Sequence, residues 1–237
     1  MEIRDLIEVG RQARYQENYA NALDIFEKSV LIAQSRKDST ALAIAQLNIA
    51  DTYIQMGRYD EASLLLQELE ADTQNRQHYT PLAYVMCLQG YLAQIQGNWE
   101  QARDLYNDAL SIAEKANADG AKGRAKGHLA ETYLPEGNAA YAEHLLREAL
   151  PLLDQTNDVE LASHFIGQYA LTMLQLGRET DGDRLLATAL QRAQRLNFVT
   201  EIRHWHQVIG QRQLDKHQYK SAFEHYHQFL QLSPDPM

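Results

Sequence analysis

Four histidines near the C-terminus come closest, in type and spacing, to a chemical site. They form two pairs around aromatic residues: His204 and His206 around Trp205, and His225 and His227 around Tyr226. Two metal ligands on one helix need a spacing of four residues, so that both face the same side. Residues two positions apart point to nearly opposite sides of a helix. We therefore expect partly exposed histidines at the edge of aromatic packing, and no metal site.

The rest of the chain contains no recognisable catalytic motif. Cys87 is the only cysteine, which excludes an intramolecular disulfide, so nothing requires an oxidising compartment. Neither Cys87 nor any serine lies in a nucleophile motif, and no glycine-rich phosphate loop follows a strand. We therefore expect no enzymatic activity, no catalytic residue and no cofactor.

Charge and hydropathy argue against two classes of partner. The formal net charge is −10, with basic residues interleaved among acidic ones, whereas nucleic-acid binding needs a basic stripe. The chain begins with the charged residues Glu2, Arg4 and Asp5 and lacks the apolar core of a signal peptide. No run approaches the ~18 apolar residues of a membrane span. We expect a cytoplasmic protein that binds neither nucleic acid nor a membrane.

A repeat of 40 residues sets the elements that position any site. Its clearest copy, residues 90–110, reads as two amphipathic helices around a Gly-Asn turn. Four columns recur at this period in six copies, which indicates a repeat array. They are small residues of the first helix (Gly10, Ala50, Gly90, Ala130, Ala170, Gly210), turn residues (Glu17, Gly57, Gly97, Gly137, Gly177, His217), small residues of the second helix (Ala22, Ala62, Ala102, Ala142, Gly182, Ala222) and bulky residues of the second helix (Phe26, Leu66, Tyr106, Leu146, Leu186, Tyr226).

The predicted fold is all-α, with twelve helices in six helix–turn–helix repeats that form a single array over residues 1–237. The repeats are placed at 3–39, 40–79, 80–119, 120–159, 160–199 and 200–232. The helices are expected at 3–15, 19–34, 40–55, 59–74, 80–95, 99–115, 121–134, 138–154, 159–175, 179–195, 199–214 and 218–231. We interpret Thr40, Thr80, Asp158 and Thr200 as helix caps. Pro135 should shorten the first helix of repeat four, and residues 116–123 should form a bent or frayed junction.

The order small, aromatic, Gly-x-aromatic, Ala-x-x-x-aromatic-x-x-Ala resembles the tetratricopeptide repeat, whose unit is ~34 residues long. The resemblance covers residues 3–231, and the longer period resembles the subclass of kinesin light chains, LGN-type adaptors and MalT-like bacterial regulators. It implies a right-handed α–α superhelix. It also implies a non-enzymatic interaction module that binds a peptide or partner domain in its concave groove.

The same resemblance implies which residues line the groove, because the first helix of each repeat faces it in this family. Repeats two and three supply an apolar patch with two tyrosines, a composition enriched where partners dock. Asn48, His128 and Gln168 share one column, and each can bond a peptide backbone. The predicted partner-binding residues are Leu47, Asn48, Asp51, Ile54, Tyr84, Leu88, Tyr91, Arg124, His128, Glu131 and Gln168. The competing interpretation is that some of them pack against neighbouring helices.

Two other functions remain open. One is a ligand-sensing or partner-sensing segment of a MalT-like signalling or transcription regulator, which would act with a separate output domain. The other is a phosphatase-like repeat regulator of the peptide-sensing type. The sequence disfavours the latter, since those proteins carry an additional N-terminal helical bundle and repeat one begins here at residue 3. Of the carboxylate clamp that binds chaperone tails, only Asn48 is present, so that partner is not implied.

The last helix predicts a second contact surface. An array normally ends with a polar outer face, because the last repeat has no neighbour to cover it. Here Phe223, Tyr226, Phe229 and Leu230 form apolar stripes at helical spacing. Inward packing accounts for Tyr226 and Phe229 more readily than for all four. We therefore expect Phe223, Tyr226 and Leu230 to be covered, by a second copy in a two-fold homodimer or by a segment absent from this chain.

Overall fold

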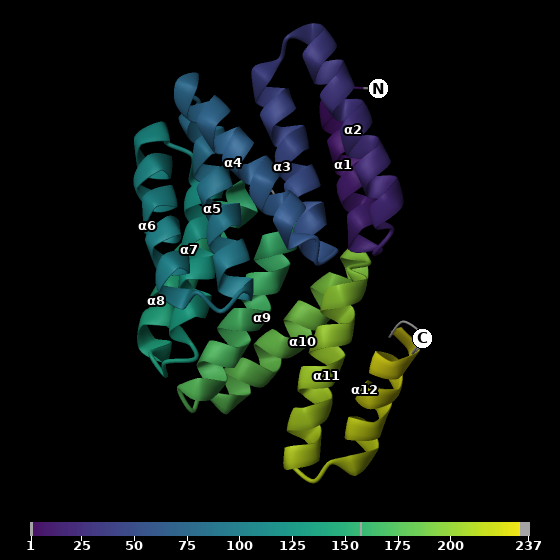
Figure 1. Ribbon diagram of the computed structural model, residues 1–237. Coiled ribbons are helices and arrows are strands. Elements are labelled where there is room, and N and C mark those ends of the chain that lie inside the picture. The colour runs from purple at the N-terminus through teal and green to yellow at the C-terminus, as the bar shows by residue number, and fades with distance from the viewer. Residues whose placement is uncertain (1, 157, 233–237) are drawn as a thin grey trace. The chain divides into compact units, whose positions relative to one another are not determined.

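The computed structural model describes residues 2–156 and 158–232, which form twelve α-helices and no strand (Figure 1). The helices are α1 (Ile3–Tyr15), α2 (Tyr19–Arg36), α3 (Ser39–Gln55), α4 (Tyr59–Asn75), α5 (Tyr79–Ile95), α6 (Trp99–Ala116), α7 (Asp119–Tyr133), α8 (Ala139–Gln155), α9 (Val159–Gln175), α10 (Glu179–Leu196), α11 (Val199–Asp215) and α12 (Tyr219–Leu232). Six helix–turn–helix repeats confirm the predicted all-α fold. None of the helices in these two ranges is long and apolar enough to cross a membrane.

The chain divides into two compact units, residues 1–14 with 18–159 and residues 15–17 with 160–237. The first unit holds the helix pairs of the first four repeats, and the second holds those of the last two. The single array predicted over residues 1–237 requires a defined arrangement of these units, and it stays a prediction.

Helix boundaries lie within two residues of those predicted, but the three threonine caps are wrong. Each of the helices concerned begins one residue before the threonine predicted to cap it: α3 at Ser39, α5 at Tyr79 and α11 at Val199. The cap of α3 is Asp38, whose carboxylate accepts a hydrogen bond from the Ala41 amide at 2.9 Å. The preceding residue, Lys37, has a left-handed conformation (φ 55°), which ends α2 sharply and lets α3 start early.

The turns within repeats follow the predicted column. All four glycines of that column have φ between 73° and 80°, and Glu17 and His217 in the terminal repeats have φ 58°. Glycine reaches this left-handed region without steric cost, which explains why four of the six turns use it. In repeat four, α7 ends at Tyr133, two residues before Pro135, so the predicted shortening by this proline is confirmed.

The stretch 116–123 is not the bent or frayed junction expected from its two glycines. Two residues join α6 to α7, the first being Asn117 in a left-handed conformation (φ 51°). Gly120 and Gly123 are buried inside α7. A Cβ at Gly120 would lie 2.4 Å from the hydroxyl oxygen of Tyr84. The glycines make room for neighbouring side chains, so their role is close packing.

The small column of the first helix and the bulky column of the second helix compensate in size. Glycine accompanies an aromatic residue and alanine accompanies leucine: Gly10 with Phe26, Gly90 with Tyr106, Gly210 with Tyr226, and Ala50 with Leu66, Ala130 with Leu146, Ala170 with Leu186. A Cβ at Gly10 would lie 2.4 Å from Cε1 of Phe26. Each pair therefore fills a similar volume, as close packing between helices requires.

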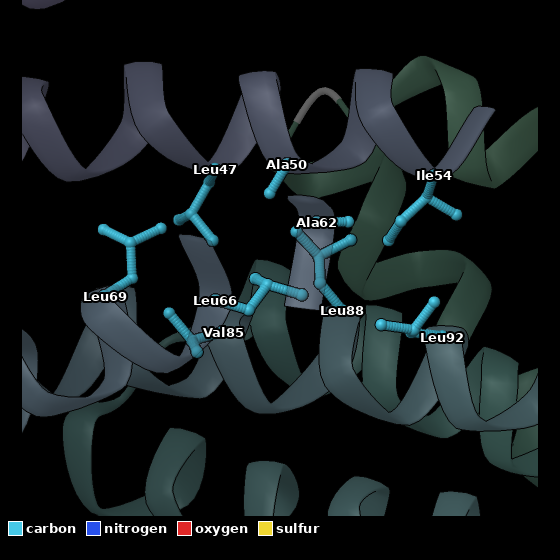
Figure 2. Packing of buried hydrophobic residues seen from close by; sticks show 9 residues of the cluster. All are labelled: Leu47, Ala50, Ile54, Ala62, Leu66, Leu69, Val85, Leu88 and Leu92. Atoms are coloured by element: carbon cyan, nitrogen blue, oxygen red, sulfur yellow. The ribbon is translucent and has the colours of Figure 1, made fainter. Parts of the chain in front are cut away.

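Figure 2 shows the core where α3, α4 and α5 meet. Nine buried residues form it: Leu47, Ala50, Ile54, Ala62, Leu66, Leu69, Val85, Leu88 and Leu92. Burial of each large aliphatic side chain stabilises the fold by roughly 1.5–3 kcal/mol. Because α3 and α5 are the first helices of consecutive repeats, this cluster joins repeat two to repeat three.

Candidate functional site

A pocket of about 190 Å³ lies between the first helices of the first four repeats, within the first unit. We call it the groove pocket. Six predicted partner-binding residues line it: Leu47, Asn48, Asp51, Tyr84, Leu88 and Arg124. The remaining lining residues are Arg11, Ile44, Thr156 and Asp158. Residues at related positions of successive repeats, on α1, α3, α5 and α7, therefore meet in one place.

Asn48 is buried at the base of a polar network in the groove pocket. Its side-chain oxygen accepts a hydrogen bond from Nε of Arg11 at 3.1 Å, and its amide nitrogen donates to the Ile44 carbonyl at 2.7 Å. Next to it, Nη1 of Arg14 and Oδ2 of Asp51 form an ion pair at 2.6 Å, with little of either side chain exposed. The backbone carbonyl orients Asn48, and Asn48 in turn orients Arg11.

The opposite wall holds Arg124, which pairs with Oδ2 of Asp158 at 3.0 Å. Burial lowers the pKa of Arg124, but the carboxylates of Asp158 and Asp51 outweigh this effect and raise it overall. The guanidinium carbon lies 5.6 Å from the centre of the Tyr84 ring, within the range of a cation–π contact. Burial raises the pKa of Tyr84, so its hydroxyl keeps its proton near neutral pH. This wall therefore offers one paired cation and one neutral hydroxyl.

Contacts between residues 37 positions apart recur along the first helices. They are Arg11 with Asn48, Arg14 with Asp51, Gln94 with Glu131 at 3.2 Å, and His164 with Glu201 at 2.9 Å. A step of 37 residues is one repeat of 40 less about one helical turn, so each side chain reaches the next repeat one turn earlier. Polar residues on the first helices thus bond to one another across repeats, which fixes their orientation.

The predicted apolar patch is largely core. Leu47 and Leu88 edge the groove pocket, but they are buried in the cluster of Figure 2. Ile54 is buried in the same cluster, 3% exposed, and does not line the pocket. Tyr84 is only partly buried, and it lines the pocket as the sequence predicts. Within the patch, Tyr84 therefore offers the largest surface to a ligand.

Tyr91, His128 and Glu131 form a separate cluster outside the pocket lining. The ring of His128 lies 5.1 Å from that of Tyr91 and stacks at 5.6 Å on Tyr106, measured between ring centres. Its Nδ1 lies 2.9 Å from a carboxylate oxygen of Glu131. Because His128 and Glu131 are largely buried and bonded to each other, their polar atoms already serve the packing of α5, α6 and α7.

Gln168 belongs to the second unit, in the middle of α9, where its side chain is partly buried and its backbone carbonyl accepts a bond from Thr172 at 2.8 Å. At the C-terminal end, Phe223 and Leu230 are 69% and 65% exposed. Tyr226 is partly buried, and its hydroxyl donates to Gln211 at 2.9 Å.

Two lining residues lie outside the first helices of the repeats, to which the resemblance assigned the groove. Thr156 and Asp158 follow α8 and reach the pocket from the loop before α9. Asp158 was interpreted only as a cap, because a contact with Arg124, 34 residues away, produces no local pattern in the sequence.

Burial raises the pKa of the Cys87 thiol to about 12, so this residue packs as a protonated thiol. Within residues 2–156 and 158–232, no three His, Cys, Asp or Glu side chains gather as a metal site would need.

Comparison with known proteins identifies the repeat. Residues 6–72 match the tetratricopeptide repeat family. By this match, residues 6–72 are tetratricopeptide repeats. The match covers repeat one and most of repeat two, and the same columns continue through the tetratricopeptide-like fold of the later repeats. No curated protein sequence matches the chain.

Several solved structures share this fold at low sequence identity. The Rap conjugation gene regulator of the plasmid pLS20, in complex with the Phr* peptide, is 15% identical with a TM-score of 0.72, over 98% of this chain and 65% of that one. Aspartyl phosphate phosphatase F from Bacillus subtilis is 12% identical with a TM-score of 0.67, over 97% and 59%. BtubC (BKLC) from P. vanneervenii is 15% identical with a TM-score of 0.62, over 100% and 96%. This chain thus spans less than two thirds of the first two proteins.

Proposed function

We propose that the first unit is a non-enzymatic binding module that holds a peptide segment of its partner in the groove pocket. The proposal rests on the pocket itself, where side chains from the first helices of four consecutive repeats converge on one hollow. Tyr84 supplies a partly exposed aromatic surface, and Arg11 and Arg124 supply hydrogen-bond donors. The similarity to a regulator solved with a peptide supports a peptide as the ligand.

Selection from a displayed random-peptide library, followed by affinity measurement with synthetic peptides, tests this function. Replacing Tyr84 with alanine should lower the affinity for the selected peptides about thirtyfold, or by about 2 kcal/mol, as expected for an aromatic anchor. The matched control is Tyr79→Ala, because Tyr79 is an exposed residue of the same helix outside the pocket. Circular dichroism would verify that both variants remain helical. Failure to select any peptide, or equal binding to the Tyr84→Ala variant, would overturn the proposal.

A second candidate is a sensing segment whose bound peptide controls a separate output. It is favoured by the similarity to a gene regulator and to an aspartyl phosphate phosphatase, both longer than this chain. A role of the peptide-sensing type, which the sequence disfavoured, is therefore kept as the second candidate. In a pull-down, a sensing segment should change its protein partners when a selected peptide is added. A binding module without a sensing role should instead lose only the partner that the added peptide displaces.

A further inference from the structure

The groove pocket and its immediate surroundings hold more arginines than carboxylates, on an acidic protein. Arg11 and Arg124 line it beside Asp51 and Asp158, and Arg14 lies directly behind Asp51. The two lining arginines balance the two lining carboxylates and Arg14 adds a third arginine, whereas the whole chain has a formal net charge of −10. Asp51 pairs with Arg14 at 2.6 Å and Asp158 with Arg124 at 3.0 Å. Of the three arginines, Arg11 therefore has no carboxylate partner among the described residues.

Arg11 also has unused hydrogen-bond donors. Among the described residues, its one bond is from Nε to the side-chain oxygen of Asn48 at 3.1 Å. A guanidinium carries five N–H groups in a rigid fork and does not lose its charge in proteins. The four N–H groups on its two terminal nitrogens therefore have no acceptor in this part of the chain. Because the Ile44 carbonyl holds Asn48 at 2.7 Å, the fork is held in a fixed orientation.

A second orphaned donor lies on the other wall. Nε of Arg124 is buried without a hydrogen-bond partner among the described residues, although the same side chain pairs with Asp158. A buried donor without an acceptor costs about 1–3 kcal/mol, so an acceptor brought by a ligand would be favoured. Both walls thus contain a guanidinium N–H group without an acceptor among the described residues.

We propose that the peptide bound in the groove pocket presents a carboxylate to the terminal nitrogens of Arg11. This inference rests on the proposed function and specifies its ligand. A carboxylate matches the guanidinium fork with two parallel hydrogen bonds, which are shorter and stronger than neutral ones. A cationic side chain at this point would meet Arg11 directly, since both pocket carboxylates are already paired. The carboxylate comes from an aspartate, a glutamate or the C-terminus of the peptide.

The test uses peptides selected from the displayed library against the native chain. For each peptide, the free-acid form is compared with a C-terminal amide, and each acidic residue is replaced in turn by its amide. One of these neutral forms should bind the native chain about tenfold or more weakly, the loss expected for one charge-assisted hydrogen bond. The form that loses affinity identifies the source of the carboxylate.

Three protein variants complete a double-mutant cycle with these peptides. Arg11→Gln should reduce affinity for the acidic peptide about tenfold or more and should not weaken the neutral peptide further. Arg11→Lys should give an intermediate affinity, because it keeps the charge and loses the fork. Arg4→Gln is the matched control, since Arg4 is an exposed residue of the same helix outside the pocket. Its affinities should equal those of the native chain.

The outcomes separate this inference from the proposed function. Peptides that depend on Tyr84 but bind the Arg11→Gln variant as well as the native chain would overturn the carboxylate and leave the peptide-binding function standing. The same holds for selected peptides whose neutral forms bind equally well. If no peptide depends on Tyr84, the proposed function falls, and the inference falls with it.

Discussion

The Nδ1 atoms of His206 on α11 and His225 on α12 lie 2.9 Å apart, so the two imidazoles share one hydrogen bond between neighbouring helices. One ring must donate its N–H and the other must accept it, which requires that the acceptor be unprotonated. His206 is 6% exposed, so the expected partial exposure is wrong for this residue. His204, by contrast, is exposed and packs edge-on against Trp205, as predicted.

This pair predicts a loss of stability on acidification. Burial lowers the pKa of His206, with His225 adding to the effect, and burial lowers the pKa of His225 against a smaller opposite effect of Glu224. Both folded-state pKa values are therefore below the unfolded value of ~6.5. As the pH falls below ~6.5, the unfolded chain takes up these protons first, so the pair lowers the free energy of unfolding. Above that pH the folded and the unfolded chain bind equal numbers of protons at His206 and His225, and the effect on stability vanishes.

Urea unfolding at pH 7.5 and pH 5 measures the effect. The native chain should lose more stability between these values than the His206→Asn/His225→Asn variant does. His227→Asn is the control, because His227 is exposed on the same helix. Equal losses in the native chain and the double variant would show that the pair does not govern this pH dependence.

The Gly10–Phe26 pair predicts a non-additive double substitution. Gly10→Ala should destabilise the protein by ~1–3 kcal/mol, although alanine raises helix propensity, because its Cβ would lie 2.4 Å from the Phe26 ring. Phe26→Leu alone should also destabilise it, because it leaves a cavity beside Gly10. The double variant recreates the natural Ala50–Leu66 combination and should be more stable than the sum of the single changes allows, by about 1 kcal/mol or more. Strict additivity in urea unfolding would contradict the size compensation between the columns.

The outer face of α12 predicts self-association through the C-terminal repeat. Phe223 and Leu230 are exposed, whereas Tyr226 and Phe229 are partly buried, so half of the apolar stripe stays open on the described chain. If a second copy covers it, Phe223→Lys with Leu230→Glu should convert a dimer to a monomer in light scattering coupled to size exclusion. Leu31→Lys, at an equally exposed leucine of α2, should leave the mass unchanged. A native chain that is already monomeric at all concentrations would refute the homodimer.

The sequence by itself determined the fold class, the twelve helices and the turn residues. These features depend on local chemistry that recurs every 40 residues, such as the glycine with positive φ at Gly97 or the proline that ends α7 at Tyr133. A signal repeated in six copies is strong even where one copy is weak. The caps predicted at Thr40, Thr80 and Thr200 were wrong because a left-handed residue three positions earlier, as at Lys37, sets the boundary.

Tertiary structure alone decided which residues of the first helices are available to a ligand. Leu47, Ile54 and His128 occupy columns that face the groove in the sequence pattern, yet side chains from adjacent helices bury them. Among the described residues Arg11 has no carboxylate partner, because Arg14 pairs with Asp51, one repeat away. The burial and pairing of these residues depend on which side chain reaches a neighbour 34 or 37 residues distant, and on the size of that neighbouring side chain. A repeat pattern specifies the column of a residue, but only the packed neighbours decide whether its polar atoms are already bonded.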